Sequence, residues 1–520
     1  MEELLYKLTA VVGEQFLLAD ESNRVLYSQD IWQRGETCAA VVQPADREQL
    51  AQLVAITTEA GYAVIARGGG MSYTRAYTPD EANSVIVDCR RMNRILEINR
   101  EDMYVTVEAG CTWKSLYEAL KGSGVRTPYW GTLSGIKATV GGSISQNSIF
   151  WGGGQYGSAV DSVLGMDVVL ADGSVLSTGS AAQINASPFF RHFGPDLTGI
   201  FTCDSGALGI KASVTLRLVP EFAARAYASF DFADYVPLLN TMNEISRQGL
   251  AMECFGFDPS LTAMRARRES VMSDAKSMLG VLKSSDSVMS AIKDGARIAM
   301  AGRSFMKDLL WPLYINIEER TESSAEAALQ QIRQIAANHG GREVANSIPK
   351  ILRGDPFGPV NNMIGPDGER WVPVHGLVAL SQAIPATAGV MDIFERHRKL
   401  IDRYVIQTGF LYNNISTNCI AIEPLFFWPD AVDDIHRDSV EPQYYRRVPK
   451  REENLQARAA VALIRQEIVD YFSSIGAAHL QIGRSYHYAS ALKSPALDLV
   501  RSIKRAVDPY GKMNPGVLGL

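Results

Sequence analysis

The stretch YAVIARGGGMS, residues 62–72, is the part of the sequence from which the fold is predicted. The apolar segment YAVIA predicts a buried strand, and three consecutive glycines follow after Arg67. Because glycine has no Cβ, a loop of this kind lets backbone N–H groups converge on an anion. The stretch therefore predicts a strand that ends in an anion-binding loop.

Two further glycine clusters follow in the same region, TVGGSISQNS (139–148) and GGGQYG (152–157). All three clusters lie beside predicted strands and within about 90 residues of one another. A single cluster of this kind is typical of an ordinary turn. Together, the three favour an extended, phosphate-bearing ligand that is held mainly by the backbone.

The third cluster matches G-x-G-x-x-G, the pattern of a dinucleotide-binding turn. That turn requires a strand directly before it and a long helix directly after it, with the helix N-terminus facing the pyrophosphate. Here LGMDVVLADGSVLSTG (164–179) follows instead and predicts a hairpin that turns at Asp172–Gly173. This context argues against a nicotinamide cofactor.

Composition narrows the class of protein. The chain has 520 residues, of which 46% are hydrophobic and 21% are charged, as in folded globular proteins. This length allows a large two-domain enzyme. The net charge is −6 and no long run of Lys or Arg occurs, so we expect no nucleic-acid partner.

Cysteines and apolar runs indicate where the protein resides. The six cysteines are scattered without C-x-x-C spacing, which is typical of reduced thiols in a reducing compartment. The N-terminus carries Glu2 and Glu3 and does not resemble a signal peptide. The longest apolar run, IAIEPLFFW (420–428), is too short for a membrane span and is interrupted by Glu423. We therefore expect a cytoplasmic protein without a spanning segment.

The order of predicted elements indicates an α+β fold. Strand 39–44, helix 46–61 and strand 62–66 form one βαβ unit, and strand-like segments follow without regular helices. From Glu221 onward, a strand–helix–strand pattern begins, and its opening is repeated from residue 313. This predicts an antiparallel sheet with helices on one face. Residues 261–300 predict a helical insertion with a solvated surface.

Six segments, in order, carry a resemblance to a known family. From about Glu36 to Pro220 the chain resembles the FAD-binding domain of the vanillyl-alcohol oxidase and p-cresol methylhydroxylase (PCMH) family. The segments are ARGGG (66–70), VIVDCRRMNRILEIN (85–99), VTVEAGCTWKSLYEAL (105–120), TVGGSISQN (139–147), YGSAVDSVLGMDVVLADGSVLSTG (156–179) and DLTGIFTCDSGALGIKASVTLRLVP (196–220). The C-terminal end, KRAVDPYGKMNPGVLGL (504–520), also resembles this family, where the chain returns to the flavin domain.

The resemblance implies a two-subdomain, PCMH-type FAD-binding domain and a cap domain whose antiparallel sheet is covered by helices. The implied boundaries are an N-terminal segment at 1–35, the FAD domain at 36–220, the cap at 221–455 and the C-terminal return at 456–520. The cap would cover the flavin ring.

The resemblance also implies the residues that contact FAD. They are Arg67, Gly68, Gly69, Gly70, Met71, Ser72, Thr139, Gly141, Gly142, Ser143, Asn147, Gly154, Tyr156, Gly157, Ile210 and Asn514. Some members of the family attach flavin covalently through His or Cys in this domain, or through His or Tyr in the cap. The glycine loop (67–77) contains no His and residues 139–157 contain no Cys, so we expect dissociable FAD. His375 in the cap is the remaining candidate for attachment, and a hydrogen-bonded structural histidine is the alternative.

The segment LQIGRSYHYAS (480–490) concentrates candidate catalytic groups. In phenol-oxidising members of the family, a Tyr-Arg pair occupies this place and a further Tyr follows the glycine loop. Arg484 matches the arginine, whereas Gly483 and Met71 stand where the two tyrosines would be, and Ser158 stands where an acid is common. We therefore predict a site in which other tyrosines take these roles. Its catalytic residues would be Arg484, Tyr486, His487 and Tyr73, and its substrate-binding residues Arg484, Tyr488 and His375.

The resulting hypothesis is an FAD-dependent dehydrogenase or oxidase of small aromatic alcohols or para-alkylphenols of the lignin-derived kind. Arg484 would bind the substrate oxygen, and Tyr486 or His487 would accept the proton. The sequence does not disclose the electron acceptor, for which oxygen, a quinone and a cytochrome are the candidates, or the oligomeric state, for which a homodimer is one candidate.

Two alternatives are kept. The first is a D-2-hydroxy acid dehydrogenase in which Arg484 binds the carboxylate. The metal-ligand motifs of that group, of the types H-x-G-D-G-N and E-H-G, do not occur in the sequence, so we predict no metal site. The second is a flavin-binding protein without turnover, which would not need the Arg/Tyr/His cluster.

Overall fold

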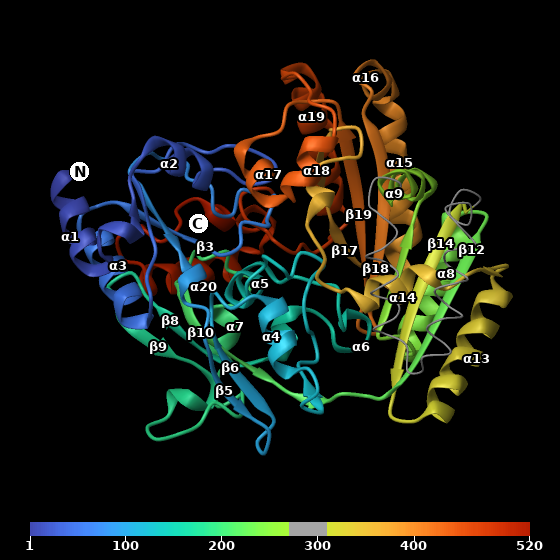
Figure 1. The fold of residues 1–520 in the computed structure, drawn as a ribbon, viewed down its shortest axis with the longest axis horizontal. Helices are drawn as coiled ribbons and strands as arrows, with labels where there is room; N and C mark the ends of the chain where they lie inside the picture. Colours follow the sequence, from blue (N-terminus) through green and yellow to red (C-terminus); the bar gives the residue numbers. More distant parts are fainter. Residues whose placement is uncertain (270–308) are drawn as a thin grey trace.

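The computed structural model describes residues 1–269 and 309–520. Figure 1 shows two halves side by side: the N-terminal half, in blue to teal, and the cap sheet, in green to orange. Of the predicted insertion (261–300), only the part within α9 (Pro259–Glu269) is described, and the remainder lies outside the described residues.

The first subdomain is a small, mainly parallel sheet with helices beside it. Its strand order is β1-β2-β4-β3, and β4 pairs in parallel with both β2 and β3. Its strands are β1 (Leu17–Leu18), β2 (Ala40–Val42), β3 (Ala63–Arg67) and β4 (Ser84–Asp88), and its helices are α1 (Glu2–Val12), α2 (Glu21–Tyr27) and α3 (Arg47–Glu59). The side chain of Asp46 caps α3 by accepting a hydrogen bond from Gln49 N, so α3 begins directly after that residue. The glycine loop follows directly after β3 of this βαβ unit.

The second subdomain is an antiparallel sheet with the order β5-β6-β10-β8-β9. Its strands are β5 (Ile95–Asn99), β6 (Tyr104–Glu108), β8 (Val163–Val169), β9 (Val175–Ser177) and β10 (Ile210–Arg217), and β7 (Val125–Arg126) pairs with β11 (Val219–Pro220) nearby. Its helices are α4 (Trp113–Leu120), α5 (Val140–Gln146), α6 (Gly153–Tyr156) and α7 (Leu197–Ile200). The predicted hairpin is confirmed as β8–β9, and Gly173 adopts a φ of 80° in its turn.

The described part of the cap forms an eight-stranded antiparallel sheet with the order β15-β12-β14-β13-β18-β19-β16, and β17 pairs with β19. Its strands are β12 (Ala224–Phe232), β13 (Glu253–Phe257), β14 (Trp311–Glu319), β15 (Arg342–Glu343), β16 (Arg370–Pro373), β17 (Gly376–Ala379), β18 (Gln407–Ile415) and β19 (Cys419–Trp428). The remaining helices are α8 (Tyr235–Gln248), α13 (Glu322–Asn338), α14 (Ser347–Gly354), α15 (Ala383–Arg396), α16 (Arg398–Arg403), α17 (Asp434–Ser439), α18 (Pro442–Arg447), α19 (Leu455–Ser474) and α20 (Ser494–Val507). The predicted α+β fold class, with a helix-covered antiparallel sheet, is confirmed.

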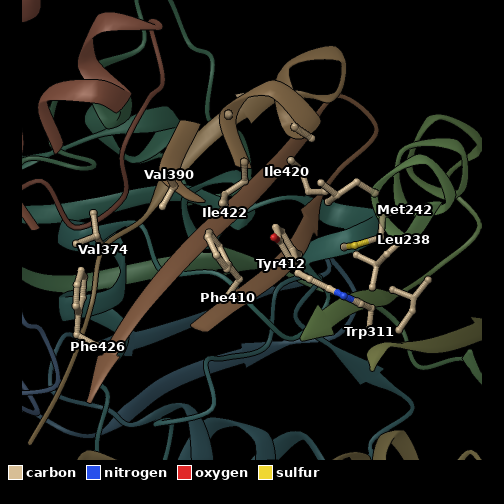
Figure 2. Close-up of a cluster of buried hydrophobic side chains, with 14 of the residues drawn as sticks. Leu238, Met242, Trp311, Val374, Val390, Phe410, Tyr412, Ile420, Ile422 and Phe426 are labelled. Atoms are coloured by element: carbon tan, nitrogen blue, oxygen red, sulfur yellow. The ribbon is translucent and has the colours of Figure 1, made fainter. Parts of the chain in front are cut away.

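The alternation of side chains on β18 and β19 divides the cap sheet into two faces. Phe410, Tyr412, Ile422 and Phe426 belong to one buried cluster, which also contains Val390 of α15 and Leu238 and Met242 of α8 (Figure 2). Successive side chains of a strand point to opposite faces, so the intervening residues point toward the FAD half. The helix-facing core therefore fixes which residues of β18 and β19 can reach a ligand.

The C-terminal segment returns to the first subdomain. Met513 forms a parallel bridge with Val64 of β3, and Asn514 N donates to Val64 O at 2.9 Å. Residues 512–514 thus extend the sheet beside the strand that carries the glycine loop. Within the described ranges, none of the helices has the length and apolarity that a membrane span requires.

Candidate functional site

The glycine loop after β3 is packed too closely for any side chain. A Cβ added at Gly69 would collide with the carbonyl oxygen of Lys137, and one at Gly141 would lie 2.5 Å from the Ala109 Cβ. Gly70 adopts a φ of 70°, which only glycine adopts readily. The backbone itself therefore forms the wall of the adjoining cavity.

A buried cation stands at the start of this loop. Arg67 is 6% exposed, and its guanidinium lies over the rings of Tyr27 and Tyr77, with Cζ 4.5 and 5.4 Å from their centroids. Among the described residues, no carboxylate lies within ion-pair distance of Arg67, and its Nε lacks a hydrogen-bond partner. A buried charge without a partner is costly, and an anionic ligand would remove that cost. Arg67 and the glycine cradle therefore fit the pyrophosphate of FAD.

These groups line a cavity of about 880 Å³, a volume that includes its open mouth. The predicted residues in its lining are Arg67, Gly68, Gly69, Gly70, Met71, Ser72, Thr139, Gly141, Gly142, Ser143 and Ile210. Lys211, also in the lining, is buried in an ion pair with Asp204. This is the cofactor cavity, and the individual FAD contacts within it stay predictions.

Five predicted cofactor residues lie outside this lining, and the structure gives the reasons. The GGGQYG stretch faces the cap: Gly154 N donates to Met252 O, and Gly152 N donates to the Glu253 side chain. Asn147 ends α5 in a left-handed conformation, and Asn514 Nδ2 donates to two backbone carbonyl groups. Asn147, Gly154, Tyr156, Gly157 and Asn514 thus lie outside the cavity lining, and their contacts with FAD stay predictions.

A second cavity, of about 1130 Å³ including its open mouth, adjoins the first. Its walls come from the glycine loop, the loop after α5, and the cavity-facing side of the cap sheet. Met71, Thr132, Ser134, Ser148 and Gln481 line both cavities. The apolar and aromatic part of the second lining is Ile31, Met71, Tyr73, Leu133, Ile149, Phe150, Leu261, Val360, Met363, Trp371, Leu411, Leu425, Phe427 and Leu480. We call it the substrate cavity.

Tyr73 lines the substrate cavity and contacts Gln481, one of the residues that line both cavities. Its hydroxyl accepts a hydrogen bond from Gln481 Nε2 at 3.1 Å, and its ring meets Trp371 edge-on, with centroids 5.6 Å apart. Burial raises the pKa of Tyr73 well above its ordinary value, so the phenol keeps its proton. Gln481 adopts a φ of 46°, an unusual conformation for a side-chain-bearing residue, and its N donates to Gln146 O at 2.7 Å. Tyr73 can therefore donate a hydrogen bond into the substrate cavity.

His375 also lines the substrate cavity, but both of its ring nitrogens are engaged. Nε2 lies 2.6 Å from Leu480 O, so it carries the proton, and Nδ1 accepts from the Tyr486 hydroxyl at 3.2 Å. Burial lowers the pKa of His375 to about 3. His375 is thus a neutral, hydrogen-bonded wall residue, and the geometry offers no free nitrogen for attachment to flavin.

Arg484 is not in either lining. Its guanidinium donates to the carbonyl oxygens of Arg75, Thr78 and Pro515, and it pairs with Asp80 at 2.7 Å. These partners occupy its donors and tie the loop after the glycine cradle to the C-terminal segment. The structure therefore places Arg484 apart from the two cavities, and its contact with the substrate oxygen stays a prediction.

The other residues predicted around Arg484 also lie apart from the substrate cavity. Tyr486 is buried behind His375, and burial raises its pKa to about 12. His487 is at the surface, where its Nε2 lies 2.7 Å from Asp470. Tyr488 packs beside Ala207 and Val517. Of the six predicted catalytic and substrate-binding residues, the structure brings only Tyr73 and His375 to the cavity.

The sequence reasoning missed several charged and amide side chains of this cavity: Arg265, Asn362, Asn413, Glu423 and Gln481. Burial raises the pKa of Glu423 to about 7, an effect that the positive charge of Arg265 opposes. One signal was present, because Glu423 interrupts the apolar run IAIEPLFFW in a strand that otherwise has no charge. A lone acid in such a strand needs a partner or a ligand.

Comparison with known proteins agrees with this geometry. Residues 38–179 match the family described as FAD binding domain, and residues 441–518 match FAD linked oxidases, C-terminal domain. The glycolate oxidase subunit GlcD of Bacillus subtilis is 31% identical over 205 residues, which are 39% of this chain and 42% of that protein. The probable mitochondrial D-lactate dehydrogenase of Danio rerio is 28% identical over 233 residues, which are 44% of this chain and 46% of that protein. The chain thus matches less than half the length of either relative.

The similarity to solved structures extends over the whole chain. The structure of p-cresol methylhydroxylase with substrate bound superposes with a TM-score of 0.73 at 19% identity and covers 100% of this chain and 96% of that one. At this identity the likeness shows the fold alone. The matched domains and the glycine cradle together identify FAD as the cofactor. The chain therefore has the PCMH-type fold, with an FAD-binding domain and the C-terminal domain of FAD-linked oxidases.

Proposed function

We propose that the protein is an FAD-dependent oxidoreductase that takes a hydride from a small aromatic alcohol or para-alkylphenol. The observation that carries this proposal is the meeting of the two cavities at Met71, Thr132, Ser134, Ser148 and Gln481. A substrate held in the second cavity would therefore lie beside a cofactor held in the first. FAD, when bound, supplies a two-electron acceptor at its N5 atom.

The chain's own residues would bind and orient the substrate. Tyr73 is protonated and would donate a hydrogen bond to the substrate oxygen near the cofactor. Gln481 holds the Tyr73 hydroxyl in position by donating to it. Such a bond restricts the substrate to poses that place its reacting carbon toward the shared wall. Tyr73 therefore takes the role that the sequence hypothesis gave mainly to Arg484.

The lining of the cavity supports an aromatic substrate. Trp371, Phe150 and Phe427 offer ring surfaces, and Leu411 and Leu425 add aliphatic contact. Apolar walls with a few polar groups are typical of small-molecule sites, in which the polar groups set orientation. A benzylic alcohol or alkylphenol matches this pattern, with a ring and one or two oxygens.

A D-2-hydroxy acid is the second candidate substrate class. The names of the curated relatives, a glycolate oxidase subunit and a D-lactate dehydrogenase, favour it. For a D-2-hydroxy acid, Arg265 rather than Arg484 would bind the substrate carboxylate, since Arg265 lines the cavity.

Several properties stay predictions. They are the electron acceptor (oxygen, quinone or cytochrome), the homodimer, the cytoplasmic location, the dissociable FAD and the four domain boundaries.

Anaerobic mixing tests the proposed function. We expect 4-hydroxybenzyl alcohol to bleach the oxidised flavin band of the FAD-loaded protein, and D-lactate to leave it unchanged. Bleaching by D-lactate alone would favour the second substrate class. If a panel of aromatic alcohols, alkylphenols and 2-hydroxy acids leaves the band intact while dithionite bleaches it, the oxidoreductase proposal is wrong.

A further inference from the structure

Two polar residues stand together on the cavity-facing side of the cap sheet. β18 and β19 pair so that Leu411 lies opposite Glu423 and Asn413 lies opposite Ala421. Asn413 and Glu423 are therefore diagonal neighbours on the same face, at a separation that long side chains bridge. Both line the substrate cavity. Two adjacent strands thus present an amide and a carboxyl group at one place.

Neither group is satisfied within the described part of the chain. Asn413 is 1% exposed, and its Nδ2 has no hydrogen-bond partner there. No described donor lies within hydrogen-bonding or ion-pair distance of the Glu423 carboxyl group. Buried polar groups are nearly always paired, and leaving one unpaired destabilises the protein. Their common orientation into a cavity points to a ligand as the missing partner.

The chemistry of the pair selects the kind of group that it binds. An ionised carboxylate only accepts hydrogen bonds, whereas the amide Nδ2 only donates them. A hydroxyl group satisfies both, because its O–H donates and its oxygen accepts. The neighbouring residues Leu411, Leu425 and Phe427 are apolar, and Arg265 is the charged residue of the same lining whose positive charge acts on Glu423.

We infer that Glu423 and Asn413 bind a neutral hydroxyl group on the substrate's aromatic ring, at the end of the molecule remote from the reacting carbon. This inference rests on the proposed function for the identity of the cavity as a substrate site, and it names the substrate class more closely as ring-hydroxylated. Tyr73 then serves the reacting end, at the shared wall. A carboxylate at the remote end would meet the Glu423 carboxylate and be repelled.

The test measures binding instead of turnover. The FAD-loaded protein is titrated calorimetrically with 4-methylphenol and with 4-fluorotoluene, in which fluorine replaces the hydroxyl group without adding bulk. We expect the phenol to bind about tenfold to a hundredfold more tightly at pH 8, since the fluoro compound leaves both protein groups unpaired. In Glu423→Leu this ratio should fall to near one, and in Glu423→Gln it should take an intermediate value. Asn362→Leu, a polar-to-apolar change elsewhere in the same cavity, is the matched control and should keep the wild-type ratio.

Three outcomes overturn the inference. They are equal binding of the two probes by the wild type, an unchanged ratio in Glu423→Leu, and loss of the ratio in Tyr73→Phe instead, which would place the ring hydroxyl at Tyr73. A normal flavin absorbance spectrum and circular dichroism spectrum for each variant establish that it is folded. The two proposals can fail separately. If the protein binds the phenol more tightly than the fluoro compound but no substrate bleaches the flavin, the proposed function is wrong and the binding inference stands.

Discussion

The two adjoining cavities are built by different means. The cofactor cavity is formed largely by backbone, with glycines at 68–70, 141 and 142 and the buried cation Arg67, and most of its lining comes from the first 211 residues. The substrate cavity is formed by side chains that come from the glycine loop, the cap sheet and the segment near Gln481. Backbone recognition suits an invariant cofactor, whereas side chains can be exchanged to suit a substrate. The predictions below test this division.

The largest effect is expected at the backbone wall of the cofactor cavity. In Gly69→Ala the new Cβ would collide with the Lys137 carbonyl oxygen, which belongs to backbone and cannot move aside cheaply. We expect the variant to be purified without FAD, as measured by its absorbance spectrum. Gly153→Ala is the matched control, because its Cβ would lie 3.8 Å from the nearest atom, Asn414 O. Normal FAD content in Gly69→Ala would show that the cradle does not form the site.

The next largest effect is expected at Arg67. Arg67→Met keeps the aliphatic stem and removes the charge, so FAD affinity should fall about tenfold to a hundredfold in a fluorescence titration. The FAD-free protein should not lose stability to urea, because the variant removes a buried cation that has no ion-pair partner among the described residues. Arg67→Lys should retain part of the affinity. A loss of stability without a loss of affinity would mean that Arg67 is structural.

On the substrate side, Tyr73→Phe should act on turnover alone. The variant loses the phenolic donor and keeps the ring that packs on Trp371, so the FAD spectrum should be unchanged. The rate of anaerobic flavin reduction should fall about tenfold or more, as is usual when one positioned hydrogen-bond donor is lost. Trp371→Phe, which alters the same aromatic contact without touching the donor, provides the comparison. An unchanged rate in Tyr73→Phe would remove Tyr73 from the proposed site.

The smallest effect is a dependence of stability on pH. Burial raises the pKa of Glu423 to about 7, so its contribution to folding is present below its ordinary pKa and is lost as the pH rises through 7. In Glu423→Gln the side chain does not ionise, so the variant does not show this loss of stability. Between pH 5 and pH 8 the free energy of unfolding of the variant should therefore rise relative to the wild type by about 1–3 kcal/mol, measured by urea denaturation. Glu118→Gln, on the exposed side of α4, should show no such change.

Much of the fold could be predicted from local sequence. The β3 strand before the glycine loop and the β8–β9 hairpin follow from apolar runs and turn residues in adjacent positions. The site was less accessible. Arg484 lies in a cluster of polar residues, yet carbonyl groups from residues 75, 78 and 515 occupy its donors, and no local pattern indicates them.

The sequence by itself determined the strand-and-glycine loops and, with them, the cofactor, because backbone conformation and the absence of Cβ atoms are local properties. Only the tertiary structure decided which polar side chains meet in the substrate cavity. Glu423 enters it because the register of β18 and β19 turns its face away from the helices, and Tyr73 meets Gln481 across 408 positions of the chain. Such contacts depend on how distant elements pack, and packing is a property of the whole chain.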